Sequence, residues 1–90
     1  MRVALNDVAD RIIHHVENGL DRPVNGPVTV RSHLAQDLQL DSMESVALLA
    51  ELEDHYGVTM PVQVFQRAQT LGDVAEAVVE VLERHGGQGT

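Results

Sequence analysis

One serine is the first candidate for chemistry in this sequence. Ser42 directly follows Asp41, and Glu44 lies three residues after that aspartate. Because this Asp-x-x-Glu spacing is typical of a capping box, we expect Ser42 in the first turn of a helix. A phosphodiester on Ser42 would meet free backbone N–H groups and the positive end of the helix dipole, and both favour an anion. Ser42 is therefore a candidate modification site.

Two other interpretations of Ser42 compete with modification. A serine next to a helix cap is commonly an ordinary first-turn residue, and a lone Asp-Ser pair would justify nothing more. A nucleophilic serine is disfavoured because the sequence contains no G-x-S-x-G motif and places no histidine beside Ser42. The residues alone therefore leave a modification site and an ordinary serine open.

The segment after Ser42 has two apolar sides at the spacing of a helix. One side is expected in the core and contains Leu48, Leu49, Leu52 and Tyr56. The other side contains Met43, Val46, Ala47 and Ala50, and its flanks carry Glu44, Glu51, Glu53 and Asp54. The helix is either buried on all sides or exposes a strip for a partner. Four unpaired carboxylates would be costly to bury, so we favour an exposed strip that binds Arg or Lys of a partner.

The elements that position Ser42 are a helix and a long loop before it and the helix that it opens. Apolar residues at gaps of three and four between Leu5 and Leu20 predict a first helix, with Asn6 and Asp7 at its N-terminal end and a stop at Asn18-Gly19. The loop 21–41 contains valines and leucines, so we expect it to pack across the domain. The helix that begins after Asp41 should end near Gly57.

The rest of the chain predicts one short and one long helix. Pro61 opens a short element over residues 61–67, and Thr70 with Asp73 forms a second capping-box pattern. The final helix is then apolar on one side as far as Leu82. Residues 85–90 have nothing to bury, so we expect a flexible tail after a single domain over residues 1–84. The expected fold class is all-α.

Composition excludes several classes of protein. The chain has 90 residues, of which 43% are hydrophobic, and this suits one small domain with an aliphatic core. It contains no cysteine, which excludes a disulfide scaffold, a cysteine zinc site and a thiol nucleophile. A formal charge of -8 disfavours nucleic acid, and no apolar run approaches the ~20 residues that span a bilayer. The scattered histidines predict no metal site, and we expect a cytoplasmic monomer with basic-surfaced partners.

The stretch from Asp37 to Val46, DLQLDSMESV, resembles the signature of the acyl carrier protein family. In that signature an acidic residue and a leucine precede Asp-Ser-Leu/Met. Later residues resemble the family's second helix, the loop behind it and the start of its fourth helix: Leu48-Leu49, Leu52-Glu53-Asp54, Tyr56-Gly57, Met60-Pro61 and Thr70-Leu71. The resemblance extends from the first helix to about Leu82.

The resemblance implies a four-helix bundle of the acyl-carrier type, with three long helices, one short helix and a long first loop. It implies that Ser42 carries 4′-phosphopantetheine, added from coenzyme A by a Mg²⁺-dependent phosphopantetheinyl transferase, and that Asp41 supports this site. The thiol of that arm would hold acyl or aminoacyl groups as thioesters for enzymes of polyketide, fatty-acid or related biosynthesis. The chain itself would have no catalytic activity.

The resemblance also implies which residues bind partner enzymes. They lie on the second helix and are Met43, Glu44, Val46, Ala47, Ala50, Glu53 and Asp54. The partners would be the transferase, an acyl- or aminoacyl-loading enzyme, and ketosynthase or acyltransferase-type enzymes with basic docking patches. Three positions depart from the common pattern: Ala47 replaces a frequent glutamate, Ala50 a larger apolar residue, and Gln39 a frequent glycine.

Two alternatives stay open. The first is a small acidic helical interaction module without a prosthetic group, in which Ser42 is an ordinary first-turn residue. The second, within the family, is an aminoacyl or peptidyl carrier, because Leu40-Asp41-Ser42-Met43 also resembles carriers that load amino acids. The start at Met1 and the short tail favour a discrete carrier, and arginine without lysine is typical of GC-rich bacterial genes.

Overall fold

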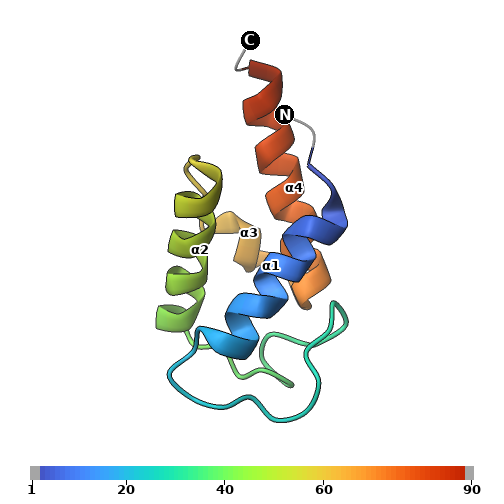
Figure 1. The fold of residues 1–90 in the computed structure, drawn as a ribbon, viewed down its shortest axis with the longest axis vertical. Coiled ribbons are helices and arrows are strands. Elements are labelled where there is room, and N and C mark those ends of the chain that lie inside the picture. The colour runs from blue at the N-terminus through green and yellow to red at the C-terminus, as the bar shows by residue number, and fades with distance from the viewer. Residues whose placement is uncertain (1–2, 89–90) are drawn as a thin grey trace.

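Four helices make up the described chain, which is residues 3–88 of a computed structural model, with side chains described for residues 3–84. The helices are α1 (Leu5–Asn18), α2 (Ser42–Tyr56), α3 (Gln63–Gln66) and α4 (Leu71–Gln88). A long loop joins α1 to α2, as Figure 1 shows. The predicted all-α bundle of three long helices, one short helix and a long first loop is confirmed.

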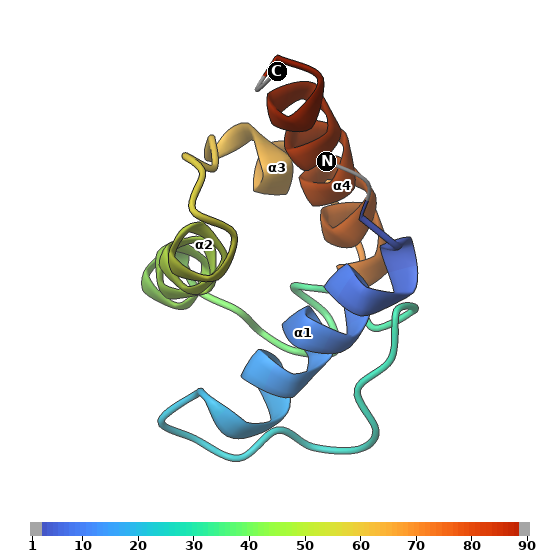
Figure 2. The same cartoon turned by 45° about the horizontal axis from the view of Figure 1, so that its top comes forward.

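The core lies where the apolar faces of the three long helices meet. In Figure 2, α1 and α4 lie against each other, whereas α2 stands farther from both. The leucines of α2 reach across to the core, since Leu48 and Leu52 are 1% and 0% exposed, and each such burial contributes about 2 kcal/mol. Tyr56 is half-buried against the same core. Each helix in residues 3–88 is too short or too polar to cross a bilayer.

The loop before α2 packs across the domain, as its apolar residues predicted. Leu38 is 2% exposed, and backbone hydrogen bonds tie the loop to the start of α4. The N–H of Leu71 donates to Ser32 O at 3.1 Å. The N–H of Gly72 donates to Val30 O at 2.9 Å. One loop therefore satisfies the first N–H groups of α4 and then leads into α2.

Both predicted capping boxes form. Asp41 Oδ1 accepts the Glu44 N–H at 2.7 Å, and Glu44 Oε1 accepts the Asp41 N–H at 3.2 Å. At α4, Thr70 Oγ1 accepts the Asp73 N–H at 3.2 Å, and Asp73 Oδ2 accepts the Thr70 N–H at 3.1 Å. The predicted end of α2 is also confirmed, because Gly57 adopts a left-handed φ of 68°, which glycine takes without a steric penalty.

Two helices differ in extent from the prediction. α3 covers Gln63–Gln66, so the element predicted over 61–67 is one turn and Pro61 precedes it. α4 continues to Gln88, beyond the predicted boundary at residue 84. Backbone hydrogen bonds can extend a helix end, and each glycine within it costs only about 1 kcal/mol relative to alanine. Residues 89–90 of the predicted tail lie outside the described residues, and the tail's flexibility stays a prediction.

Candidate functional site

Ser42 is the first residue of α2, and its side chain is exposed. The Asp41 backbone before it is extended, with φ -89° and ψ 178°, and the Asp41 carboxylate accepts the Glu44 N–H. The first N–H groups of a helix have no intrahelical acceptor. Within the described chain, the N–H groups of Ser42 and Met43 have no other acceptor either. An exposed hydroxyl therefore lies beside backbone donors that favour an anion.

The surroundings of Ser42 fit a phosphopantetheine arm. A shallow hollow of about 240 Å³ adjoins the serine and is lined by Ser42, Met43 and Val46. The hydroxyl can form a phosphate ester, and the N–H donors of the first turn suit the phosphate. The apolar side chains of Met43 and Val46 suit the carbon atoms of the arm.

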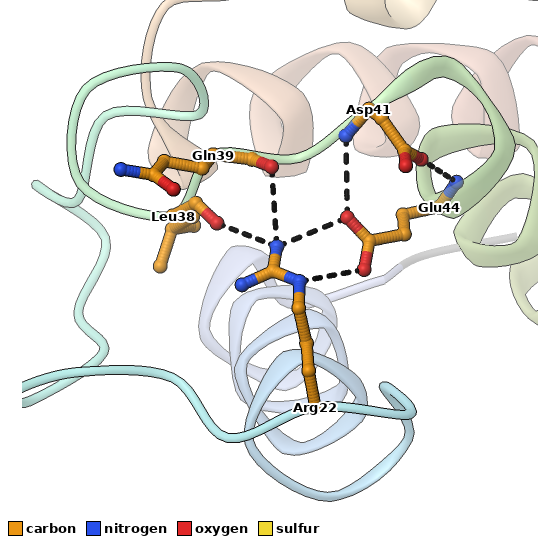
Figure 3. Close-up of polar contacts among 5 residues, drawn as sticks. All are labelled: Arg22, Leu38, Gln39, Asp41 and Glu44. Atoms are coloured by element: carbon orange, nitrogen blue, oxygen red, sulfur yellow. Dashed lines mark hydrogen bonds and ion pairs between the residues drawn. The ribbon is translucent and has the colours of Figure 1, made fainter.

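An arginine from the long loop meets the start of α2 beside this serine. Arg22 Nε donates to Glu44 Oε2 at 2.9 Å, and Arg22 Nη2 donates to Glu44 Oε1 at 3.0 Å. The same Nη2 donates to Leu38 O at 2.7 Å and to Gln39 O at 3.1 Å (Figure 3). Sequence reasoning did not include Arg22, because no local pattern links residues twenty-two positions apart. We call these contacts the Arg22 clamp.

The clamp changes the charge that Glu44 presents. The hydrogen bond from Arg22, together with the Asp41 N–H, holds the pKa of Glu44 below its ordinary value. Glu44 in turn raises the pKa of Arg22. The carboxylate is ionised at neutral pH, but a guanidinium lies directly against it. Glu44 is therefore part of a neutralised pair, and its side chain is only 19% exposed.

Gln39 adopts an uncommon backbone conformation three residues before Ser42. Its φ is 53°, and in residues 3–88 no other non-glycine residue has a positive φ. A side chain in this left-handed region costs roughly 1–2 kcal/mol relative to the right-handed one. Glycine would adopt it freely, which explains why the departure from a frequent glycine at this position matters. The Gln39 carbonyl is one of the acceptors in the Arg22 clamp.

The outer side of α2 is exposed, as the strip interpretation predicted. Met43 is 80% exposed and Val46 is 59% exposed, and Ala47 and Ala50 are exposed as well. A helix buried on all sides is therefore wrong for this chain. The four residues lie on one side of α2 at helical spacing, and Met43 and Val46 line the hollow beside Ser42.

The premise of four unpaired carboxylates on α2 is wrong, however. Glu44 is held by Arg22, and Glu51 lies 3.9 Å from Arg11. Glu53 Oε2 accepts the Met60 N–H at 2.8 Å and so fastens the chain behind α2. Asp54 is exposed. The acids at positions 44 and 53 thus have structural partners within the chain, which a helical projection of the sequence does not reveal.

The described residues contain no group of three or more His, Asp or Glu side chains placed to hold a metal ion. His14 and His15 are neighbours on α1, and the Nδ1 of His14 lies 3.2 Å from the Asn18 amide nitrogen. His55 packs edge-on against Tyr56 at the other end of α2 from Ser42. The groups that the structure places around Ser42 are its own hydroxyl, the backbone donors of the first turn and the Arg22 clamp.

Comparisons with known proteins identify the family of this chain. The sequence matches the family described as "Phosphopantetheine attachment site" over residues 10–78. It is 34% identical over 61 residues to an acyl carrier protein of Rhodococcus erythropolis, an alignment that covers 68% of this chain and 66% of that one. It is 27% identical over 67 residues to an acyl carrier protein of Tropheryma whipplei, with 74% and 78% covered.

A solved structure gives the same result for the fold. A Mycobacterium tuberculosis protein, named as a candidate acyl carrier protein, superposes with a TM-score of 0.60 at 27% identity, over 87% of this chain and 99% of that one. The class defined by fold and site is a helical carrier domain with a phosphopantetheine attachment site. The chain belongs to the acyl carrier protein family, whose cofactor is covalent 4′-phosphopantetheine.

Proposed function

We propose that Ser42 is the attachment residue and that the chain carries acyl or aminoacyl groups between enzymes. When bound, 4′-phosphopantetheine supplies a terminal thiol that holds such groups as thioesters. The observation that carries the proposal is the placement of Ser42. It is an exposed hydroxyl in the first turn of α2, beside N–H groups that no carbonyl of the described chain occupies.

The modification itself is a phosphoryl transfer with coenzyme A as the second reactant. The Ser42 Oγ forms a bond to the phosphorus of the pantetheine phosphate, and the pyrophosphate bond of coenzyme A breaks. The leaving group is adenosine 3′,5′-bisphosphate, and the serine proton passes to a base of the transferase. The first-turn N–H groups and the positive end of α2 stabilise the negative charge of the diester that results.

The partners proposed are a phosphopantetheinyl transferase and enzymes of polyketide, fatty-acid or related biosynthesis. They would bind the exposed strip next to Ser42, formed by Met43, Val46, Ala47 and Ala50, with Asp54 at its edge. Glu44 and Glu53 also belong to the proposed docking surface. Their role there is to hold its shape, because Arg22 binds the carboxylate of Glu44 and the Met60 N–H donates to that of Glu53. The chain would act in the cytoplasm and have no catalytic activity of its own.

Intact-mass spectrometry tests the proposal. The folded protein is incubated with coenzyme A, Mg²⁺ and a broad-specificity phosphopantetheinyl transferase, and the modified peptide is mapped. We expect one phosphopantetheine on Ser42 and none on Ser42→Ala. Ser45→Ala is the matched control, because Ser45 lies one turn further along the same helix and its loss should leave the mass gain unchanged.

The competing function is an interaction module without a prosthetic group. A folded wild-type protein that gains no mass would favour that module and contradict the proposal. A gain that persists in Ser42→Ala would move the attachment site elsewhere and contradict the assignment of Ser42.

A further inference from the structure

We propose that Arg22 is a positioning residue for phosphopantetheine transfer to Ser42, because its guanidinium holds the chain on both sides of that serine. The inference rests on the proposed function of Ser42. Before the serine, Arg22 Nη2 binds the carbonyls of Leu38 and Gln39 at 2.7 and 3.1 Å. After the serine, Arg22 binds both carboxylate oxygens of Glu44 at 2.9 and 3.0 Å.

The contacts require the planar fork of an arginine. Two nitrogens face two carboxylate oxygens, and one of those nitrogens also reaches two backbone carbonyls (Figure 3). An ammonium group is a point donor and cannot reproduce this parallel pairing. The clamp thus joins three separate pieces of chain: the loop after α1, the turn before α2 and the first turn of α2.

The turn at Gln39 explains why a clamp is needed here. The residue has a left-handed φ of 53°, which a side chain disfavours, and this φ sets the direction in which the chain enters Asp41 and Ser42. Leu38 on one side is buried in the core, so the turn cannot shift as a whole. Without Arg22, the local preference of Gln39 for negative φ would compete with the native path. By binding the Gln39 carbonyl directly, Arg22 stabilises the positive φ of this residue.

The expected consequence is a slower transfer step in a folded protein. An attacking oxygen must lie close to and in line with the phosphorus, and an error of about 1 Å can cost 10²-fold in rate. We expect Arg22→Gln to lower kcat for modification of Ser42 about tenfold, with a smaller change in KM for the carrier. A merely structural role would act differently: a reduced folded fraction raises the apparent KM and leaves kcat unchanged.

Arg11→Gln is the matched control. Arg11 is 37% exposed where Arg22 is 36% exposed, and it also pairs with a glutamate of α2, Glu51, at 3.9 Å. The substitution removes the same charge and one ion pair to the same helix but leaves the turn before Ser42 intact. Glu51 lies more than two turns beyond Ser42, so kcat should stay within about twofold of the wild type.

A second substitution tests the mechanism. Glycine adopts a positive φ freely, so Gln39→Gly should restore most of the kcat lost in Arg22→Gln when the two are combined. The same proteins are compared without transferase by hydrogen exchange of the segment 36–46. Exchange there should be faster in Arg22→Gln than in Arg11→Gln, and slower again in the double variant. Should Arg22→Gln lose its helical circular dichroism, Arg22→Lys takes its place, since it keeps the charge without the fork.

The outcomes separate the two proposals. A wild-type protein that is never modified contradicts the proposed function and this inference with it. A wild-type protein that is modified, together with Arg22→Gln turning over at the rate of Arg11→Gln, overturns the role of Arg22 alone. A loss of kcat that Gln39→Gly fails to restore overturns it too, as does a rise in apparent KM at constant kcat.

Discussion

The starts of α2 and α4 share the same capping motif, but one start is exposed and the other is buried. Each begins with a reciprocal capping box, formed by Asp41 with Glu44 and by Thr70 with Asp73. The residue after the cap is an exposed serine in α2, whereas in α4 it is Leu71, which is 1% exposed.

The two starts differ most in their backbone donors. At α4, the first-turn N–H groups of Leu71 and Gly72 donate to carbonyls of the long loop. A Cβ on Gly72 would lie 3.1 Å from one of those carbonyl oxygens, so loop and helix are in close contact. At α2, the corresponding N–H groups of Ser42 and Met43 have no acceptor in the described chain. A capping box therefore specifies where a helix begins, and packing decides whether that start can receive an anion.

The largest effect that would test this comparison is on stability. Leu71→Ala removes a fully buried side chain at the start of α4 and should lower the free energy of unfolding by about 3 kcal/mol. Met43→Ala, at the equivalent end of α2, should change it by no more than about 0.5 kcal/mol. Urea denaturation measures both. Similar losses in the two variants would mean that the start of α2 is buried in solution.

The caps themselves provide a sharper test. Asp41→Ala and Thr70→Ala each remove the side chain that accepts the third-residue N–H, and each should cost about 1 kcal/mol in denaturation. Only Asp41→Ala should also slow phosphopantetheine transfer, because only that cap adjoins Ser42. Equal transfer rates in the two variants would show that the cap at the start of α2 does not affect modification of Ser42.

The smallest effect concerns acid pH. Hydrogen bonds lower the pKa of Glu44, chiefly through Arg22, and the pKa of Asp73, chiefly through the Gln69 and Thr70 N–H groups. Groups with a lowered folded pKa contribute stability above their ordinary values of 4.5 and 3.8, and this stability is lost as pH falls through the folded pKa. Glu44→Gln and Asp73→Asn should each flatten the fall in melting temperature below about pH 5.

Salt distinguishes the two carboxylates. About 1 M salt screens the ion pair of Glu44 with Arg22 more than the hydrogen bonds that neutral N–H groups donate to Asp73. The difference between wild type and Glu44→Gln should therefore shrink in salt, while that of Asp73→Asn should persist. If the difference between wild type and Glu44→Gln does not change with salt, the contact between Arg22 and Glu44 is not ionic.

Much of the fold was predictable because its signals are local. Apolar residues at helical spacing predicted the three long helices, and both capping boxes were read from residues three positions apart. The core leucines of α2 and the exposure of Met43 and Val46 followed from the same periodicity. The end of α4 at Gln88 was less predictable, because a helix end depends on weak local backbone preferences.

The site was predictable only in part. The position of Ser42 in a first turn follows from Asp41 and Glu44, and the start of α2 at Ser42 confirms it. Arg22 was not predictable, since its contacts depend on the path of a loop through the domain. The helical spacing of the sequence predicted that the acids of α2 are unpaired and bind a partner. The structure shows instead that Glu44 and Glu53 have partners from outside the helix.

The sequence by itself determined where the helices begin, which faces are apolar and which serine follows a cap, because these depend on residues within one or two turns of each other. Only the tertiary structure decided which helix start keeps its N–H groups available and which carboxylates are neutralised. Those outcomes depend on the long loop, whose carbonyls occupy the start of α4 and whose Arg22 reaches the start of α2. Such contacts form between distant parts of the chain, and no local spacing encodes them.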